Sequence, residues 1–303
     1  MKALVTGGAG FIGSHLTDML IDSGAEVHII DNLTTGSIKY VNPAATLHIE
    51  DINSDSSSQI IQTVKPDVVF HMAAQVDVQR SIADPAFDAN VNIVGTVRLI
   101  HACKQAGVEK IIFSSTSAVY GVSKKERASE DALPSPISYY GLSKHASECY
   151  IRLFHELNGI NYTILRYSNV YGPRQTAKGE GGVIAIFMSN LHKGLPLFVH
   201  GSGNQNRDFI FVQDVVRANI AASRQGNQET INISTALPTS INNLVHRLNM
   251  IHGSAIDVAH GPERPGDIMD SCLDNLKAEQ ILGWRPKVSL IEGLTQTYEY
   301  YRK

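Results

Sequence analysis

A glycine-rich turn near the N-terminus constrains the fold of this chain more than any other feature. The turn Thr6–Gly13 follows a short β-branched run and opens a segment with helical spacing, Ile12–Ser23. Glycines at Gly7, Gly10 and Gly13 suit a tight turn, the approach of a backbone to a pyrophosphate, and close packing of a helix on a strand. Because the pattern lies between a strand and a helix, it predicts a dinucleotide-binding turn.

Strand-like and helix-like segments alternate through the first half of the chain. This alternation predicts a mostly parallel sheet covered by helices on both faces, with ligands at the carboxyl ends of the strands. We expect strands at Ala3–Thr6, Val27–Asp31, Thr46–Glu50, Val68–His71, Lys110–Ser114 and Tyr162–Arg166. Helical spacing predicts helices at Ile12–Ser23, Phe87–Ala106 and Tyr140–Leu157.

The rhythm changes after about Gly172, where segments shorten and glycine and proline recur. A helix at Phe209–Ser223 and a strand at Thr230–Ser234 are expected to return to the first lobe. The predicted fold is therefore α/β, a Rossmann-like doubly wound parallel sheet with a smaller mixed α/β lobe. We expect the sheet domain to comprise residues 1–171 and 208–234, and the smaller lobe to comprise residues 172–207 and 235–303.

Composition excludes several classes of protein. The 26 Lys and Arg residues nearly balance the 29 Asp and Glu residues, so nothing predicts binding to nucleic acid or to an anionic membrane surface. Three scattered cysteines, Cys103, Cys149 and Cys272, indicate neither a disulfide framework nor a metal site. No apolar run approaches the roughly 18 residues of a membrane span. We expect no metal, no membrane contact and a cytoplasmic location.

Acidic residues follow the second and third predicted strands. Asp31 is positioned to accept hydrogen bonds from the hydroxyls of an adenosine ribose, and it would repel a 2′-phosphate, so NAD is favoured over NADP. Asp51, with Ile52, is a candidate for the adenine edge. The alternative for both acids is an ordinary solvated position after a strand.

Tyr140 and Lys144 stand one helical turn apart on one face of a predicted helix. A nearby ammonium stabilises the phenolate and lowers a tyrosine pKa toward neutrality, which suits proton transfer. A run of hydroxyl side chains, Ser114–Ser117, ends a predicted strand about 25 residues before this pair. The pair therefore indicates acid–base chemistry beside the predicted dinucleotide site.

These motifs occur in order together with His71–Gln75, Ser114–Gly121 and Leu165–Pro173. In this respect the chain resembles the extended short-chain dehydrogenase/reductase family, and within it is similar to the UDP-glucose 4-epimerases. The resemblance covers essentially the whole chain, including Leu282–Pro286 and Glu292–Leu294 near the C-terminus.

The resemblance implies an NAD-dependent inversion at C4 of a UDP-hexose through a 4-keto intermediate. Tyr140 would be the catalytic acid/base, Lys144 would bind the nicotinamide ribose and tune Tyr140, and Thr116 would supply the catalytic hydroxyl, where many epimerases have serine. The implied cofactor-binding residues are Gly7, Gly10, Phe11, Ile12, Gly13, Asp31, Asn32, Asp51, Ile52, Ala73, Ala74, Asn92, Ser114, Tyr140, Lys144 and Tyr167.

The same resemblance implies a nucleotide-sugar site. Asn169, Arg207 and Arg264 would hold the diphosphate, while Asp267 would anchor the ribose or orient Arg264. Ser271 stands where some epimerases have a bulky tyrosine, so we expect UDP-GlcNAc to be accepted along with UDP-glucose. The implied substrate-binding residues are Thr116, Ser117, Tyr140, Asn169, Val183, Arg207, Arg264, Asp267 and Ser271. Family members pair two helices into a dimeric bundle, so a homodimer is expected.

Other functions on the same scaffold stay open. One alternative is a 4-epimerase of UDP-glucuronate or a UDP-pentose, in which Arg174 would compensate for the absence of a basic residue at Thr176. A 4,6-dehydratase of nucleoside-diphosphate sugars would need Asp-Glu directly after Thr116, where Ser117-Ala118 stands instead. A non-enzymatic NAD-sensing protein is disfavoured by the intact Thr116, Tyr140 and Lys144.

Overall fold

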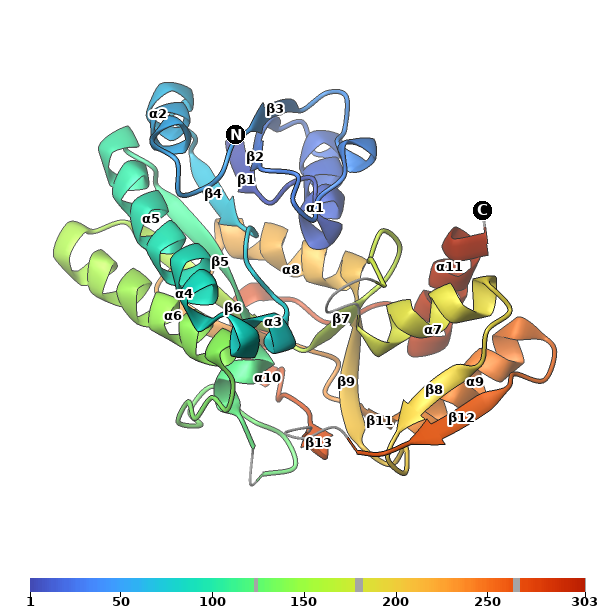
Figure 1. The fold of residues 1–303 in the computed structure, drawn as a ribbon. Helices are drawn as coiled ribbons and strands as arrows, with labels where there is room; N and C mark the ends of the chain where they lie inside the picture. Colours follow the sequence, from blue (N-terminus) through green and yellow to red (C-terminus); the bar gives the residue numbers. More distant parts are fainter. Residues whose placement is uncertain (123–124, 178–181, 264–267, 303) are drawn as a thin grey trace.

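The computed structural model describes residues 1–122, 125–177, 182–263 and 268–302 (Figure 1). Its largest element is a seven-stranded sheet in the order β10-β6-β5-β4-β1-β2-β3, with every pair of neighbours parallel. This confirms the predicted Rossmann-like architecture. The strands are β1 (Lys2–Thr6), β2 (Glu26–Asp31), β3 (Thr46–Ile49), β4 (Val68–His71), β5 (Lys110–Thr116), β6 (Asn161–Tyr167) and β10 (Glu229–Ile233).

Helices cover both faces of this sheet because successive strand residues are buried on opposite sides. Val5 of β1 packs in one hydrophobic cluster with Leu16 of α1, while Leu4 packs in another with Leu99 of α5. In Figure 1, α1 (Phe11–Asp22) and α8 (Val212–Arg224) cover one face. The opposite face carries α2 (Asp55–Val64), α5 (Gly95–Ala106) and α6 (Tyr139–Asn158).

The predicted helix Phe87–Ala106 is interrupted in the structure. α4 (Pro85–Ala89) passes through a π-helical turn at Asn90–Val94 before α5 begins, and the short helix α3 (Val78–Ala83) precedes α4. Within the turn, the side chain of Asn92 bonds both the backbone N–H and the carbonyl of Gln75, at 2.9 Å each. The wider turn thus coincides with a side chain that fixes the loop after β4.

The smaller lobe is built from short strands. β9 (Asn206–Phe211) pairs with β7 (Asn169–Tyr171), β11 (Pro238–Ser240) and β13 (Asp270–Ser271), while β8 (Leu197–His200) pairs with β12 (Val258–Gly261). The helices of this half of the chain are α7 (Val183–His192), α9 (Ile241–His252), α10 (Leu276–Leu282) and α11 (Leu290–Arg302). Two short 3₁₀ turns lie at Ile38–Tyr40 and Ser117–Tyr120 in the first lobe.

The predicted helix from Phe209 was wrong at its start. Phe209–Phe211 belongs to β9 and pairs in parallel with Asn169–Tyr171, and the helix begins only at Val212. Aromatic and β-branched residues favour a strand when a neighbouring strand satisfies their backbone. As predicted, the segments that follow return to the first lobe. α8 packs against the large sheet, and β10 belongs to that sheet, where it pairs with β6.

Candidate functional site

The three glycines of the N-terminal turn lie where backbone segments come closest. Gly7 has a φ of +69°, and a Cβ atom there would lie 2.7 Å from the backbone nitrogen of Ala73. A Cβ on Gly13 would lie 2.1 Å from the carbonyl oxygen of Gly7. Gly10 is the N-cap of α1 and offers no side-chain acceptor to the first amides of the helix. These amides and the helix dipole suit a pyrophosphate. The next two predicted residues, Phe11 and Ile12, are half-buried in the first turn of the helix.

An acidic corner lies beside this turn, at the ends of β2 and β3. Asp31 is 7% exposed, and its carboxylate accepts from the backbone N–H of Ala9 at 2.9 Å and of Leu33 at 2.8 Å. Each oxygen keeps a further lone pair for a hydroxyl. The Asn32 amide donates to Asp51 at 2.8 Å, so three of the predicted residues meet here. Ile52, next to them, is buried.

A buried polar chain joins the ends of β1 and β4, between which the strand order reverses. The Thr96 hydroxyl donates to the Asn92 carbonyl at 2.6 Å, so it accepts from His71 Nε2 at 3.0 Å. His71 Nδ1 then accepts from the Thr6 hydroxyl at 2.8 Å, which in turn accepts from the N–H of Ala73 at 3.2 Å. Burial, helped by a nearby lysine, lowers the pKa of His71 to about 3. A neutral histidine therefore fixes the backbone at Ala73 and Ala74, where an open α/β sheet binds its ligand.

The predicted hydroxyls at the end of β5 have separate tasks. Ser114 donates to the carbonyl of His71 at 2.9 Å and so ties β5 to β4. Thr116 is half-buried, and its hydroxyl oxygen accepts from the N–H of Ala118 at 3.2 Å. Because the Thr116 oxygen acts as the acceptor in this bond, its hydroxyl hydrogen stays available for a different acceptor. Ser117 is half-buried at the start of the 3₁₀ turn.

Tyr140 and Lys144 lie in the first two turns of α6. The N-cap Ser138 accepts from the N–H of Gly141 at 3.1 Å, and the N–H of Tyr140 donates to Ser81 of α3 at 3.1 Å. Tyr140 is half-buried, whereas Lys144 is 3% exposed, with its ammonium 4.5 Å from the ring centre of Phe113. Burial lowers the pKa of Lys144 to about 7, although two buried carboxylates oppose the shift. The site thus combines a phenol with a desolvated cation one turn away.

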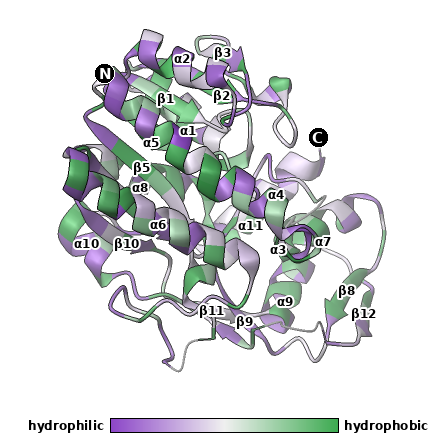
Figure 2. Cartoon of the chain, turned by 60° about the vertical axis from the view of Figure 1, so that its left-hand side comes forward, coloured by the Kyte–Doolittle hydropathy of each residue, from purple (hydrophilic) through white to green (hydrophobic). Residues whose placement is uncertain are grey.

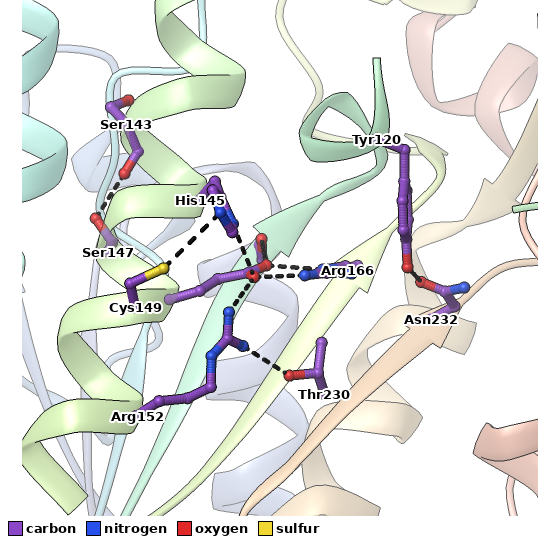
Figure 3. Close-up of polar contacts among 11 residues, drawn as sticks. Tyr120, Ser143, His145, Ser147, Cys149, Arg152, Arg166, Thr230 and Asn232 are labelled. Atoms are coloured by element: carbon purple, nitrogen blue, oxygen red, sulfur yellow. Dashed lines mark hydrogen bonds and ion pairs between the residues drawn. The ribbon is translucent and has the colours of Figure 1, made fainter. Parts of the chain in front are cut away.

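Glu148, one turn beyond Lys144, was not predicted. It is fully buried and accepts from Ser115 at 2.6 Å and from Arg166 at 2.8 and 2.6 Å. Arg152 reaches the same carboxylate at 3.1 Å, as Figure 3 shows. Burial alone would raise the pKa of Glu148, but the hydrogen bonds, chiefly from Arg166, hold it well below the usual value. The cluster fixes α6 against β5 and β6. In the sequence, only the regular spacing of Tyr140, Lys144 and Glu148 along one helix face could have indicated Glu148.

Two predicted cofactor residues have side chains that are used inside the protein. Asn92 is 3% exposed, and its amide bonds Gln75, Asp88 and Ser143. The Tyr167 hydroxyl donates to Asn219 at 2.9 Å, and burial raises the pKa of this tyrosine. A contact of Tyr167 with a cofactor would therefore have to come from its backbone, and Asn92 supports the loop after β4.

Apart from Thr116, Ser117 and Tyr140, the described substrate residues of the prediction lie on β7, α7, β9 and β13. Arg207 of β9 is half-buried and donates to the carbonyl of Asn206 at 2.7 Å, and the strand register places Ser271 of β13 directly beside it. Asn169 is exposed at the start of β7, and Val183 is the first residue of α7. Arg264 and Asp267 lie outside the described residues.

Asp208, next to Arg207, is a second residue that the sequence did not reveal. It is fully buried and accepts from the N–H and hydroxyl of Thr235 at 3.0 and 2.7 Å, from Ala236 at 3.1 Å and from Leu273 at 3.4 Å. Burial raises the pKa of Asp208, and these hydrogen bonds oppose the shift. Asp208 thus joins β9, which carries Arg207, to the loop after β10 and to the segment that follows Ser271.

The described residues contain neither a cluster of metal ligands nor a membrane-spanning helix. No group of His, Cys, Asp and Glu side chains there could hold a metal ion. In the same residues, no helix combines the length and apolar character that a bilayer crossing requires.

Comparison with known proteins adds a family and three close structures. The sequence model of the NAD-dependent epimerase/dehydratase family matches residues 3–234. A UDP-glucose 4-epimerase of Thermotoga maritima, solved with UDP-glucose, is 44% identical, with a TM-score of 0.97 over 100% of this chain and 99% of that one.

Two further structures are similar over nearly their full length. A UDP-glucose 4-epimerase of Thermus thermophilus, solved with NAD, is 39% identical, with a TM-score of 0.95 over 100% of this chain and 99% of that one. A UDP-N-acetylglucosamine 4-epimerase of Methanobrevibacter ruminantium, solved with UDP-N-acetylmuramic acid, is 36% identical, with a TM-score of 0.94 over 99% of this chain and 97% of that one.

Proposed function

The chain belongs to the NAD-dependent epimerase/dehydratase family, and on that premise we propose that it interconverts UDP-glucose and UDP-galactose by inversion at C4. The observation that carries this proposal is the pair of Tyr140 and buried Lys144 on α6, a helix whose first turn packs against the 3₁₀ turn that follows Thr116 at the carboxyl end of β5. This edge of a doubly wound sheet is where such folds bind ligands. The chain is an enzyme of the UDP-sugar 4-epimerase type.

The residues fit NAD. At Gly7 and Gly13 a Cβ would collide with neighbouring backbone atoms, so no side chain fits in the turn. The uncapped amides of α1 would hold the pyrophosphate. Asp31 would accept from the adenosine ribose, with Asn32 and Asp51 beside the adenine. Ala73 and Ala74 would line the floor, and Lys144 would donate to the nicotinamide ribose. When bound, NAD supplies a reversible hydride acceptor for C4.

The residues of the chain manage the proton and the orientation of the sugar. Tyr140, as phenolate, accepts the proton of the C4 hydroxyl when that carbon is oxidised to a ketone, and returns it on reduction from the other face. Lys144 stabilises the phenolate. Thr116 donates its hydroxyl hydrogen to the sugar. Oxidation and reduction cancel, so the reaction has no net redox change.

The smaller lobe would hold the nucleotide. We propose that residues 172–207 and 235–303 bind the UDP-sugar, while residues 1–171 and 208–234 bind NAD. The small sheet crosses this boundary, because β7 and most of β9 fall within the NAD-binding ranges. Arg207 would hold the diphosphate by charge-assisted hydrogen bonds, with Asn169 and Arg264 completing that site. Ser271 neighbours Arg207, so its small side chain would leave space for a 2-acetamido group and allow UDP-GlcNAc as a second substrate.

The alternatives within the family are less well supported by the residues present. Dehydration needs a proton donor after Thr116, and Ala118 cannot supply one. Arg174, the candidate cation for a glucuronate carboxylate, pairs with Asp18 of α1 at 2.8 Å. This contact occupies the guanidinium, which also lies over the ring of Tyr40, 5.8 Å from its centre.

The direct test is an NMR time course of the purified protein with UDP-glucose and with UDP-GlcNAc in separate tubes, first without and then with added NAD. We expect the galacto epimer of each, with the hydrogen at C4 retained because hydride returns to the same carbon. Extensive deuterium from solvent at C4 would contradict the mechanism. Absence of any epimer in both tubes would redirect the assignment to UDP-glucuronate or a pentose.

We also propose a homodimer through α5 and α6, which run side by side on one face (Figure 2). The outward stripe of α6 exposes Leu142 (50%), Tyr150 (47%), Leu153 (56%) and Leu157 (72%). Such a stripe on a long helix is typical of an interface. Leu153→Lys should convert a dimer to a monomer in light scattering, whereas Leu237→Lys, at a 65% exposed leucine of the other lobe, should not. A monomeric unmodified protein would refute the proposal.

We further propose a cytoplasmic location, where the three free cysteines would stay reduced.

A further inference from the structure

The sheet domain buries two charged side chains on helices that pack together, Lys144 of α6 and Asp88 of α4. Lys144 is 3% exposed and Asp88 of α4 is 1% exposed. Among the residues that the structure describes, neither one forms an ion pair within 4.0 Å. Because a buried charge needs compensation, each of these groups requires a counter-charge nearby.

Asp88 is held at one oxygen only. Its Oδ1 atom accepts from Gln75 Nε2 at 2.9 Å and from Asn92 Nδ2 at 3.2 Å. Its Oδ2 atom is buried and has no hydrogen-bond partner. A carboxylate oxygen without a donor is unusual at this depth, so the groups that face it need to be identified.

α4 packs against α6, which carries Lys144. No hydrogen bond from Lys144 Nζ occurs within the described part of the chain, and the ammonium lies 4.5 Å from the ring centre of Phe113. Burial lowers the pKa of Lys144 to about 7, and the charges of Glu148 and then Asp88 oppose this shift. The other titratable groups on this face are Tyr140, one turn earlier, and His71 of β4, which is neutral.

The two carboxylates differ in their own counter-ions. Glu148 is hydrogen-bonded to Arg166 and contacted by Arg152, so its charge is already compensated. Asp88 has no such cation. Arg80 of the adjacent α3 lies over the ring of Phe87, 4.0 Å from its centre. Lys144 is therefore the buried cation that Asp88 is left to balance.

We infer that Asp88 is the buried counter-ion of Lys144, a positioning residue that keeps the lysine charged beside the proposed nicotinamide site. The hydrogen bonds of Asp88 extend this role. Asn92, bonded to Asp88, also donates to the Ser143 hydroxyl at 3.0 Å, and that hydroxyl donates to the Tyr140 carbonyl at 3.1 Å. One carboxylate thus supports both members of the tyrosine–lysine pair. The inference rests on the proposed function for its activity readout alone.

The decisive variant is Asp88→Asn, which keeps an oxygen for Gln75 and Asn92 and removes the charge. In the NAD-loaded protein, loss of the negative charge favours the neutral amine, so Lys144 should lose its proton at lower pH. We expect the alkaline limb of kcat/KM for UDP-glucose to move down by about one pH unit or more. Asp84→Asn is the matched control, because Asp84 is an exposed N-cap of the same helix and asparagine caps equally well.

A second measurement does not depend on turnover. The ¹³Cε resonance of Lys144, assigned with Lys144→Arg, reports the protonation of the amine directly. Its titration midpoint should fall in Asp88→Asn and stay in place in Asp84→Asn. An unchanged midpoint in folded Asp88→Asn would overturn the inference, even if activity fell. If the unmodified protein turned over no UDP-sugar, the proposed function would fail and this midpoint would still decide the role of Asp88. Should Asp88→Asn prevent folding, Asp88→Ser carries the same test.

Discussion

The two lobes build their parts of the site in different ways. In the sheet domain the proposed contacts to the pyrophosphate come from the backbone, which is held in place by the parallel strands and by glycines that leave no space for a side chain. In the smaller lobe, Arg207 and Ser271 project from short strands whose outer residues are half-exposed, and a single buried carboxylate, Asp208, joins the segments. The first arrangement suits a cofactor of constant shape. The second suits substrates that vary in the sugar.

Disruption of the glycine turn should have the largest effect and act on every substrate. In Gly13→Ala, the new Cβ would lie 2.1 Å from the Gly7 carbonyl oxygen, so the turn has to move. We expect purified protein to lose most of its NAD, and the free energy of unfolding to fall by about 1–3 kcal/mol. NAD released on denaturation and a urea titration measure these two quantities.

The matched control lies at a helix start in the other lobe. Gly182 is the N-cap of α7, and among the described residues its Cβ would meet only the flexible end of Gln175, at 3.3 Å. Gly182→Ala should keep normal NAD content. If both alanine variants lost NAD equally, the proposed contrast would be wrong. That contrast is between a sheet domain whose glycines leave no space for a side chain and a smaller lobe whose side chains can move.

Loss of Arg207 should have an intermediate effect and act on substrate alone. Arg207→Met removes charge-assisted hydrogen bonds to the diphosphate, so KM for UDP-glucose should rise about 10- to 100-fold. NAD content should be unchanged. Arg247→Met, at a half-buried arginine of α9 that bonds Asn243, is the control with the same change of charge. A loss of NAD in Arg207→Met would place this arginine with the sheet domain instead.

The sequence predicted those features whose signals are local. The glycine turn, the Tyr140–Lys144 spacing and the β-branched strands each lie within a few residues, and their geometry follows from one element. The strand that replaces the predicted helix start at Phe209 depends on pairing with Asn169–Tyr171, far away in the sequence. Tertiary pairing overrode the local pattern there.

The buried carboxylates Glu148, Asp208 and Asp88 could not be predicted for the same reason, since their partners come from distant segments. Glu148 and Arg166 meet from α6 and β6, and Asp208 is bonded by residues 235, 236 and 273. Asp88 stands one turn before Asn92, and only the packing of α4 on α6 brings it to the helix that carries Lys144. A charged side chain can be buried where other groups compensate its charge. The fold brings those groups together from distant parts of the sequence.

The smallest effect, and the most selective, should come from Ser271. A tyrosine in Ser271→Tyr would stand beside Arg207 and narrow the space for a 2-acetamido group. The ratio of UDP-GlcNAc to UDP-glucose turnover should fall about tenfold or more, since a steric clash of this size costs a few kcal/mol at most. Both sugars measured with one protein preparation give an internal control. Equal loss of both activities would mean that Ser271 does not border the sugar, and that the adaptable lobe selects its substrate elsewhere.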